Sequence, residues 1–470
     1  MDKRTKTKLT YLQRARAGAA VCDHLVIELR ETARLALPLT LAQLGQIAMT
    51  TTDLVLIGHF SSEAVAAAGL AVKVYSVCVT FGMGLLAAVA TIAAEAFGAG
   101  KLASVRRSVR MGLWATLLLS LPIMLLPLLS EQMLVALGQA PDAARLAQQY
   151  LVGLTWGLAP ALWFLAIRSF MGAVHRPQPI LWIMLAAVPC NALLVYLLIH
   201  GKLGLPKLEL FGAGLATTLV NFATFLAGLW FVTTRRPFSD YHVLAHLWRP
   251  DWTQMRRLIV IGIPVSIAFL MEGTIWSAAA LLIGMISTRA LAAHQIAAQV
   301  GAILFMIPTG ISMAANVRVG YALGRNDGPG VKKAGLVAIL LGTVTSAILA
   351  ILIIVARFEI AEFFLGNQAG ALIDLTTDLI LVGASCFVTT AVYSIALASL
   401  RGLKDTRIPL LFAAVGYWLV GFSLSCLLGL KIGFGAIGVW VGLSIGTTLY
   451  AALLVLRFLL LASRLGLQGR

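Results

Sequence analysis

Charged residues are scarce in this sequence: only 12% of its 470 residues are Asp, Glu, Lys or Arg, while 60% are hydrophobic. A water-soluble protein carries about 25% charged residues, so the composition excludes an ordinary soluble fold. Segments of strictly alternating polarity, which a transmembrane β-barrel needs, are also missing. Instead, apolar runs of about 20 residues recur along the chain, each long enough to cross roughly 30 Å of hydrocarbon as a helix. The sequence therefore predicts an all-α membrane protein.

Motifs for metal, nucleotide or covalent chemistry are absent as well. The five cysteines stand apart from one another, without the spacing of metal ligands. No phosphate-binding glycine loop, zinc motif or nucleophile elbow occurs in a workable context. We therefore expect no metal, no cofactor and no enzyme activity. A membrane-embedded enzyme, which is the alternative, would need an acid–base or metal constellation within the spans.

Twelve membrane spans can be placed along the chain, and they define its predicted domains. The N-lobe is expected at 35–234 and the C-lobe at 257–461, joined by a cytoplasmic linker at 235–256. A basic cytoplasmic tail, 1–34, precedes them, and a second cytoplasmic tail, 462–470, follows. The predicted spans are 35–60, 65–97, 108–129, 147–170, 178–200, 210–233, 257–284, 292–322, 333–355, 372–398, 407–430 and 434–461.

The net charge of +17 reports membrane topology rather than a nucleic-acid partner. If the N-terminus is cytoplasmic, 29 of the 36 Lys and Arg residues fall on the cytoplasmic side of the predicted spans. This asymmetry follows the positive-inside rule. Both termini are therefore predicted to be cytoplasmic.

An internal repeat divides the chain into two halves. VLIGHFSSEAVAAAGLA (Val55–Ala71) matches LLIGMISTRALAAHQIA (Leu281–Ala297) without a gap, with identity at 8 of 17 positions. Later in each half, RSFMGAVHRPQPI (Arg168–Ile180) matches ASLRGLKDTRIPL (Ala398–Leu410) in nearly the same register. Because each half has six spans, an even number, both halves begin on the same face of the membrane. They are therefore predicted to be parallel repeats. Transporters built in this way place their path between the halves.

Several motifs in this order resemble the multidrug and toxic compound extrusion (MATE) family, in its NorM-type branch. They are LPLTLAQLGQIAMTTTDLVLIGHFSSEAVAAAGLA (Leu37–Ala71), LGQAPDAARLAQQYL (Leu137–Leu151), LAAHQIA (Leu291–Ala297), IPTGISMAANVRVG (Ile307–Gly320) and SLRGLKDT (Ser399–Thr406). The resemblance covers nearly the whole chain after the tail. It implies two six-helix lobes forming a V around a central cavity.

The resemblance also implies a function. The expected activity is export of small, cationic, amphipathic drugs across the bacterial inner membrane by alternating access, in exchange for H⁺ or Na⁺ as coupling ion. The expected partners are these organic cations and the lipid bilayer, with no nucleic acid. We expect the protein to act as a monomer.

Two acidic residues, Asp53 and Glu272, lie deep in predicted spans. A carboxylate at the bilayer centre costs about 2.5–3.5 kcal/mol on insertion scales, so it normally faces a cavity or a partner. Burial favours the protonated form of a carboxyl group, so such a residue can exchange protons. We predict that both acids carry the cation coupling. A role in helix packing is the alternative for each, and the resemblance matches them to the family's N-lobe aspartate and seventh-helix glutamate.

Uncharged polar residues in the spans are predicted to bind substrate or to support the two acids. Asn191 could hydrogen-bond Asp53 or hold two helices together, and Thr217 and Thr218 could instead bond to their own helix. Gln295 could face the transported compound or pack between helices. The predicted residues are Gln46, Asn191, Thr218 and Gln295.

The coupling ion is predicted from an absent acid. Na⁺-linked members of the resembled family carry an aspartate about ten residues before the SLRG motif. Here that position is near Thr390, in CFVTTAVYS, which contains no acid. H⁺ coupling is therefore favoured, with a Na⁺-coupled exporter as the alternative.

A second alternative is a flippase of lipids or lipid-linked oligosaccharides from the same superfamily. A flippase would be expected to line its cavity with several arginines. Here the basic residues are predicted to stay near the membrane faces, which favours drug export.

Overall fold

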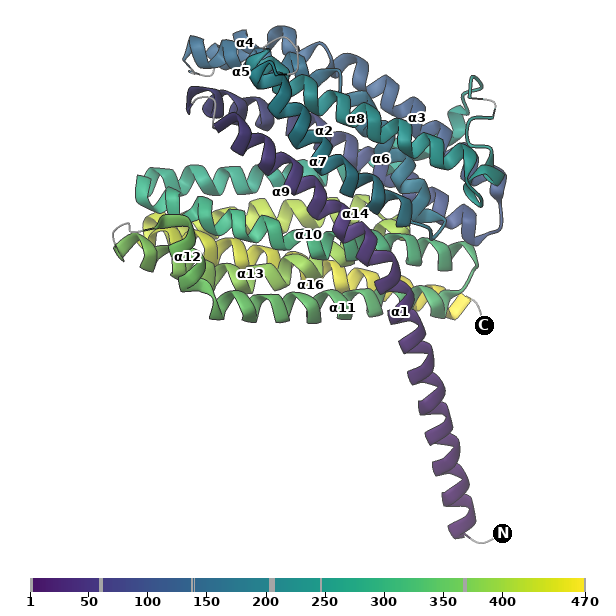
Figure 1. Cartoon of the computed structure of the whole chain (residues 1–470). Coiled ribbons are helices and arrows are strands. Elements are labelled where there is room, and N and C mark those ends of the chain that lie inside the picture. The colour runs from purple at the N-terminus through teal and green to yellow at the C-terminus, as the bar shows by residue number, and fades with distance from the viewer. Residues whose placement is uncertain are drawn as a thin grey trace.

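The computed structural model describes residues 3–58, 62–136, 138, 140–202, 208–245, 247–366 and 370–468. Within these ranges the chain is almost entirely helical and has no strand (Figure 1). A helix satisfies its backbone hydrogen bonds within one segment, which lipid surroundings require. Residues 1–2 and 469–470, at the ends of the two predicted tails, lie outside the described residues.

Helices lie at each of the six spans predicted for the N-terminal half, and a 3₁₀ turn lies in the linker. These elements are α1 (Lys3–Gly58), α2 (Ser62–Gly98), α3 (Leu102–Ile123), α4 (Leu126–Ala136), α5 (Pro141–Thr155), α6 (Leu158–Ala173), α7 (Gln178–His200), α8 (Glu209–Thr234) and the 3₁₀ turn η1 (Phe238–Tyr241).

The C-terminal half repeats this order. Its helices are α9 (Trp252–Ile286), α10 (Thr288–Gly324), α11 (Gly328–Val355), α12 (Arg357–Leu365), α13 (Gly370–Gly402), α14 (Arg407–Ala413), the π-helical η2 (Ala414–Phe422), α15 (Ser423–Cys426), the π-helical η3 (Leu427–Lys431) and α16 (Gly435–Gln468).

Nine helical segments of the described chain are long and apolar enough to cross a membrane. The bent pair α5 and α6, which meet at 46°, adds a tenth crossing. The C-terminal part of α1 and the helix α3 occupy the two remaining predicted spans. The protein is thus an all-α, multi-pass membrane protein of two lobes.

The first helix is longer than its predicted span. Residues from Lys3 to Arg34, expected as a tail, continue the same helix α1 that forms the first crossing. Figure 1 shows the N-terminal turns of α1 projecting beyond the bundle. Pro38 lies inside this helix, and its repeat equivalent Pro264 lies inside α9.

The two lobes meet through helices that are equivalent in the repeat. Helix α2 packs on α9 and α10, and α1 packs on α10. A Cβ atom on Gly98 would lie 2.1 Å from the backbone oxygen of Tyr321, and one on Gly310 would lie 2.0 Å from Thr40 Oγ1. Glycine therefore permits a backbone approach that no other residue allows. These contacts lie at the end of the bundle predicted to be cytoplasmic.

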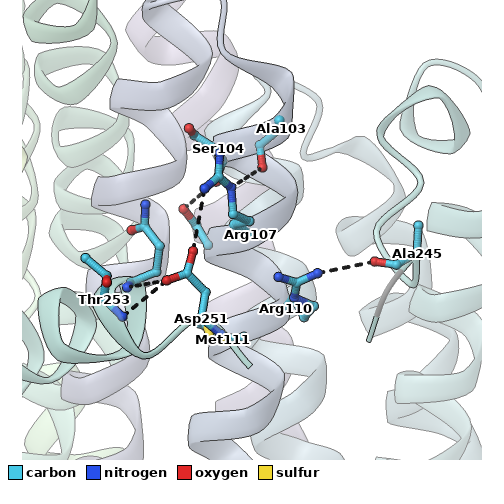
Figure 2. Close-up of polar contacts among 10 residues, drawn as sticks. Ala103, Ser104, Arg107, Arg110, Met111, Ala245, Asp251 and Thr253 are labelled. Atoms are coloured by element: carbon cyan, nitrogen blue, oxygen red, sulfur yellow. Dashed lines mark hydrogen bonds and ion pairs between the residues drawn. The ribbon is translucent and has the colours of Figure 1, made fainter. Parts of the chain in front are cut away.

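The linker between the lobes is held against α3 (Figure 2). Arg107 forms an ion pair of 3.6 Å with Asp251, and Arg110 donates a hydrogen bond of 3.5 Å to the backbone oxygen of Ala245. Asp251 also caps α9, accepting from the backbone N–H groups of Thr253 and Gln254. Such a cap satisfies the first free N–H groups of the helix. The linker thus joins the start of the C-lobe to the N-lobe.

We predict that Gly98→Ala opens this end of the molecule. The new Cβ would sit 2.1 Å from a backbone oxygen, whereas ordinary contact begins at 3.4 Å. Helices α2 and α10 must therefore move apart until that overlap is relieved. Double electron–electron resonance between spin labels at positions 101 and 325 should show a longer distance than in the wild type.

Gly69→Ala, on the same helix α2, is the matched control, since its Cβ would meet nothing within 4 Å. Its label distances should equal those of the wild type. Unchanged distances in Gly98→Ala would contradict the close-packed arrangement.

Candidate functional site

A cavity of about 1030 Å³ lies between the lobes. Helices α1, α2 and α6 line it from the N-lobe, and α9, α10, α13 and α16 line it from the C-lobe. Because both lobes contribute, relative movement of the lobes would change its access. Its aromatic lining residues are Phe269, Trp276, Phe305, Phe387, Tyr393 and Trp440.

Asp53 lies within the N-lobe, where its side chain on α1 meets residues of α7 and α8. Its side chain is buried, and it accepts hydrogen bonds from Asn191 Nδ2 and, at 3.2 Å, from Thr217 Oγ1. Asn191 is fully buried. The threonine hydroxyl can donate to an ionised carboxylate or accept from a protonated one. These neighbours can therefore accommodate either form of the carboxyl group.

The neighbouring threonine has a different role. Thr218 Oγ1 donates a hydrogen bond of 2.6 Å to the backbone oxygen of Gly153. A Cβ on Gly157 would lie 2.6 Å from the same hydroxyl. Thr218 therefore supports the bend between α5 and α6, and Thr217, one residue earlier, is the threonine that the structure brings to Asp53.

Glu272 faces the central cavity from α9. It is partly buried and accepts a hydrogen bond of 2.6 Å from Tyr393 Oη. The ring of Tyr393 packs against those of Tyr417 and Tyr450, with centroids 5.9 Å and 5.2 Å apart. A large aromatic cluster thus holds one carboxylate at the cavity wall, where a bound compound can reach it.

The other predicted residues are divided between cavity and surface. Gln295 lines the cavity. Gln46 is exposed and is not among the described lining residues, whereas Gln43, one helical turn earlier, is buried and lines the cavity. Thr390 also lines the cavity, and its hydroxyl donates to the backbone oxygen of Cys386. The residue at the position of the absent acid therefore does face the cavity.

Two arginines that sequence reasoning missed line the cavity. Arg168 and Arg401 are each only 7% exposed and both belong to its wall. The prediction did not place these two arginines in the cavity wall. Arg168 lies at the end of the predicted span 147–170 and Arg401 just after the span 372–398, where arginines are usually solvated. The repeat gave one signal that the two arginines occupy similar places in the two lobes. It aligns Arg168 with Ala398, which lies one helical turn before Arg401.

The end of the cavity predicted to be cytoplasmic is closed by contacts between the lobes. Lys404 Nζ lies 2.6 Å from a carboxylate oxygen of Glu95, and Arg318 lies 2.5 Å from Glu28. Thr91 Oγ1 donates a hydrogen bond of 2.9 Å to Asn316 Oδ1. Each pair joins the N-terminal half to the C-terminal half. These bonds must break if the cavity is to open on this side.

An aromatic cluster at the same end contains His175, in the turn between α6 and α7. Its ring lies 5.7 Å from that of Phe97 on α2 and 4.8 Å from that of Tyr321 on α10, measured between centroids. Burial, and secondarily the nearby Arg318, lowers the pKa of His175 to about 4. The closed arrangement therefore favours the neutral imidazole.

Comparison with known proteins agrees with the repeat. The MatE family model matches residues 38–197 and 264–427. The two matched ranges begin as far apart in the sequence as Val55 and Leu281. They end as far apart as Arg168 and Ala398. The two matches therefore lie in the registers of the internal repeat.

Curated relatives match over nearly their full length. "Probable multidrug resistance protein NorM" of Bradyrhizobium diazoefficiens is 57% identical over 445 residues, covering 94% of this chain and 96% of that protein. The protein of the same name from Rhodopseudomonas palustris is 50% identical over 433 residues, covering 92% and 91%.

Solved structures show the same fold at low identity. The crystal structure of the eukaryotic MATE transporter AtDTX14 matches with a TM-score of 0.84 and 19% identity, covering 93% of this chain and 96% of that one. An outward-facing MATE transporter of the MOP superfamily matches with a TM-score of 0.85 and 18% identity, covering 93% and 97%. The two-lobe, twelve-helix fold of these transporters is therefore the fold of this chain.

We predict that closure of this end weakens as the pH falls from about 7 to 5. The lowered pKa of His175 means that the closed form binds a proton less readily than an open form that exposes the imidazole to water, since an unperturbed imidazole has a pKa of about 6.5. The contribution of His175 to closure is full above pH 6.5 and is lost as the pH falls toward 4. The distance between labels at positions 101 and 325 should lengthen over this range.

Asn is the matched replacement, because His175 has a φ of 60°, a conformation that Asn tolerates better than most residues. His175→Asn cannot take up the proton and should remove this part of the pH dependence. An unaltered pH profile in the variant would assign the effect to other groups.

Proposed function

The chain belongs to the MatE family, in its NorM-type branch, and from this membership we propose that it is a multidrug exporter of the bacterial inner membrane. It exchanges cytoplasmic amphipathic organic compounds for an inward-moving cation by alternating access. Both termini face the cytoplasm, it works as a monomer, and it catalyses no covalent reaction. Curated relatives bearing the name of multidrug resistance proteins support the transport activity.

The buried Asp53 is the observation on which the coupling mechanism rests. It lies in the N-lobe with Asn191 and Thr217, away from the described lining of the central cavity that contains Glu272. A cation can thus bind at one site while the transported compound occupies the other. Protonation of Asp53 removes the charge to which Asn191 and Thr217 donate, so the packing of α1, α7 and α8 can respond. Such a response would change the shape of the N-lobe wall.

The closed contacts support one assignment of the conformational state. With the termini in the cytoplasm, the contact of Glu95 with Lys404 closes the cytoplasmic end, which favours the outward-facing state. In the proposed cycle, proton uptake from outside releases the compound, and reopening of these contacts admits the next one. Each elementary charge that crosses 100 mV supplies about 2.3 kcal/mol, so a single proton can drive a useful concentration gradient.

We predict that Asp53→Asn stops energised efflux without preventing folding. The amide keeps the shape of the carboxyl group but carries no exchangeable charge. Ethidium efflux from cells should fall to the level of cells lacking the protein, while the purified variant elutes as a single species and still binds ethidium.

Two adjacent threonines provide the control. Thr217→Val removes one donor to Asp53 and should lower efflux partially. Thr218→Val removes the bonds to the Gly153 and Leu154 backbone oxygens, so it should lower thermal stability without altering the dependence on the driving cation. Wild-type efflux by Asp53→Asn would overturn the assignment of the coupling site.

We predict that the coupling ion is H⁺. A proton needs one carboxylate, whereas Na⁺ needs several oxygen ligands to replace its water, and Thr390 stands where Na⁺-linked members carry an acid. In Na⁺-free proteoliposomes, abolishing the pH gradient should stop transport, and added Na⁺ should not restore it. Thr390→Asp should introduce a response to Na⁺. Transport driven by a Na⁺ gradient alone, at fixed pH, would move the coupling site to Glu272.

A further inference from the structure

A second pocket, of about 570 Å³, lies at the end of the bundle predicted to be cytoplasmic. Helix α2 of the N-lobe contributes Ile92 and Glu95 to its wall. The C-lobe contributes the start of α9, the first residue of α14 and the turn before it. This pocket shares no described lining residue with the central cavity. It is therefore a separate site, outside the cavity between the lobes.

The second pocket is strongly basic. Four basic lining residues and one acid give it a formal charge of +3, namely Arg256, Arg257, Lys404 and Arg407 against Glu95. Lys404 Nζ lies 2.6 Å from a carboxylate oxygen of Glu95, so these two charges compensate each other. The three arginines are exposed, and no carboxylate of the described chain lies within 4.0 Å of their nitrogen atoms. Three guanidinium groups thus share one pocket without a counterion from these residues.

The acids that flank these arginines in the sequence are engaged elsewhere. Asp251 caps α9 and forms its ion pair with Arg107. Asp405 accepts a hydrogen bond of 2.8 Å from Arg457 Nε on α16. The three pocket arginines therefore stay available to an anion from outside the chain.

One face of α9 continues the pocket into the membrane. Arg256 and Val260 line the pocket. Ile263 and Ile267 follow Val260 at intervals of three and four residues, so they share its side of the helix, and all three are exposed. Trp252, one turn before Arg256, is exposed as well. This face of α9 thus runs from an aromatic residue through a basic one to apolar ones, the order in which a helix enters a bilayer.

The same face points away from the central cavity. Trp276 lines that cavity and lies nine residues beyond Ile267. At 3.6 residues per turn, this spacing puts the two side chains on roughly opposite sides of the helix. The side that packs on the N-lobe is marked by Ser266, which donates a hydrogen bond of 2.7 Å to the backbone oxygen of Phe81 on α2. The face from Trp252 to Ile267 is therefore left to meet lipid.

We propose that the second pocket binds the phosphate of an anionic phospholipid from the cytoplasmic leaflet. The arginines bind the phosphate group, and the acyl chains lie along the apolar part of the α9 face. The proposed orientation of the chain places the pocket in that leaflet. The lipid is a bound ligand at the edge of the bundle and not an exported compound, so the inference goes beyond the proposed function.

The chemistry of the pocket fits such a lipid. A guanidinium group presents N–H donors in a planar fork that can bind a phosphate through two parallel hydrogen bonds. Basic pockets between helices on the cytoplasmic side are typical sites for anionic head groups. Phosphatidylethanolamine carries the same phosphate, but its ammonium group cancels the charge and is repelled by a basic pocket. An anionic lipid is therefore favoured over a neutral one.

The test compares phosphatidylglycerol with phosphatidylethanolamine of the same acyl chains. Native mass spectrometry of the purified full chain gives an apparent Kd for each lipid. We expect Arg256→Gln and Arg407→Gln each to weaken phosphatidylglycerol binding about fivefold, the contribution of one basic group near an anionic surface. Phosphatidylethanolamine binding should change less than about twofold by the same scale. Glu95→Gln removes an acid from the pocket and should instead tighten phosphatidylglycerol binding.

Further variants separate lipid recognition from folding. Arg256→Lys keeps the charge without the planar fork, so its apparent Kd for phosphatidylglycerol should fall between those of the wild type and Arg256→Gln. Without lipid, Arg256→Gln should melt at the wild-type temperature, because the side chain is exposed and forms no ion pair. Added phosphatidylglycerol should raise the melting temperature of the wild type more than that of the variant. A lower melting temperature without lipid, together with equal loss of both lipids, would overturn the proposal and make Arg256 a structural residue.

Two controls test whether the pocket and the acyl chains matter. Lys332→Gln removes an exposed charge outside the pocket and should leave both apparent Kd values unchanged. An effect as large as that of Arg256→Gln would overturn the proposal, since any surface charge would then attract the lipid. Glycerol 3-phosphate carries the phosphate without acyl chains and should not displace phosphatidylglycerol at equal concentration. Displacement would overturn the lipid assignment in favour of a soluble phosphate. Because binding is measured without transport, these results are independent of the export function.

Discussion

The cost of placing a charge in hydrocarbon governs the arrangement of this molecule. Each deep charge has a distinct solution: Asp53 takes two hydrogen-bond donors from neighbouring helices, and Glu272 takes the hydroxyl of Tyr393. Arg168 donates to the neutral amide oxygen of Gln43, and Arg401 lies over the ring of Phe269 with Glu272 nearby. Each of these four charges is thus held by groups of its own lobe, so the two lobes can move relative to each other without exposing a deep charge to lipid.

Contact between the lobes combines apolar packing with a close approach at small residues. Two core clusters contain residues of both lobes, such as Leu39 with Ile311 and Leu85 with Ile261. Helices α2 and α10 approach until a Cβ at Gly98 would collide with backbone, and a few hydrogen bonds and ion pairs surround that contact. His175 adds a group whose protonation opposes closure.

The candidate site was only partly predictable. Asp53 and Asn191 could be paired from the sequence because both are polar residues deep in apolar spans, where a polar group needs a partner. Thr217 and Thr218 could not be told apart, since adjacent residues on a helix differ by about 100° and the rotation of α8 was unknown. Gln46 is the repeat equivalent of Glu272, yet Gln43 is the glutamine that faces the cavity. The repeat alignment identifies equivalent positions on equivalent helices, but it does not show which neighbours each side chain contacts.

The sequence by itself determined that the chain lies in lipid, where its spans fall and that it contains a repeat. The hydrophobic length of each helix and the register of the repeat are properties of the chain alone. The sequence also determined which acids are deep. Only the tertiary structure decided which side of each helix meets the cavity, and with it the positions of Arg168 and Arg401 in the cavity wall. Near the end of a span, an arginine can extend to the membrane face or turn inward, and local sequence is the same in both cases. The packing of the facing lobe makes that choice.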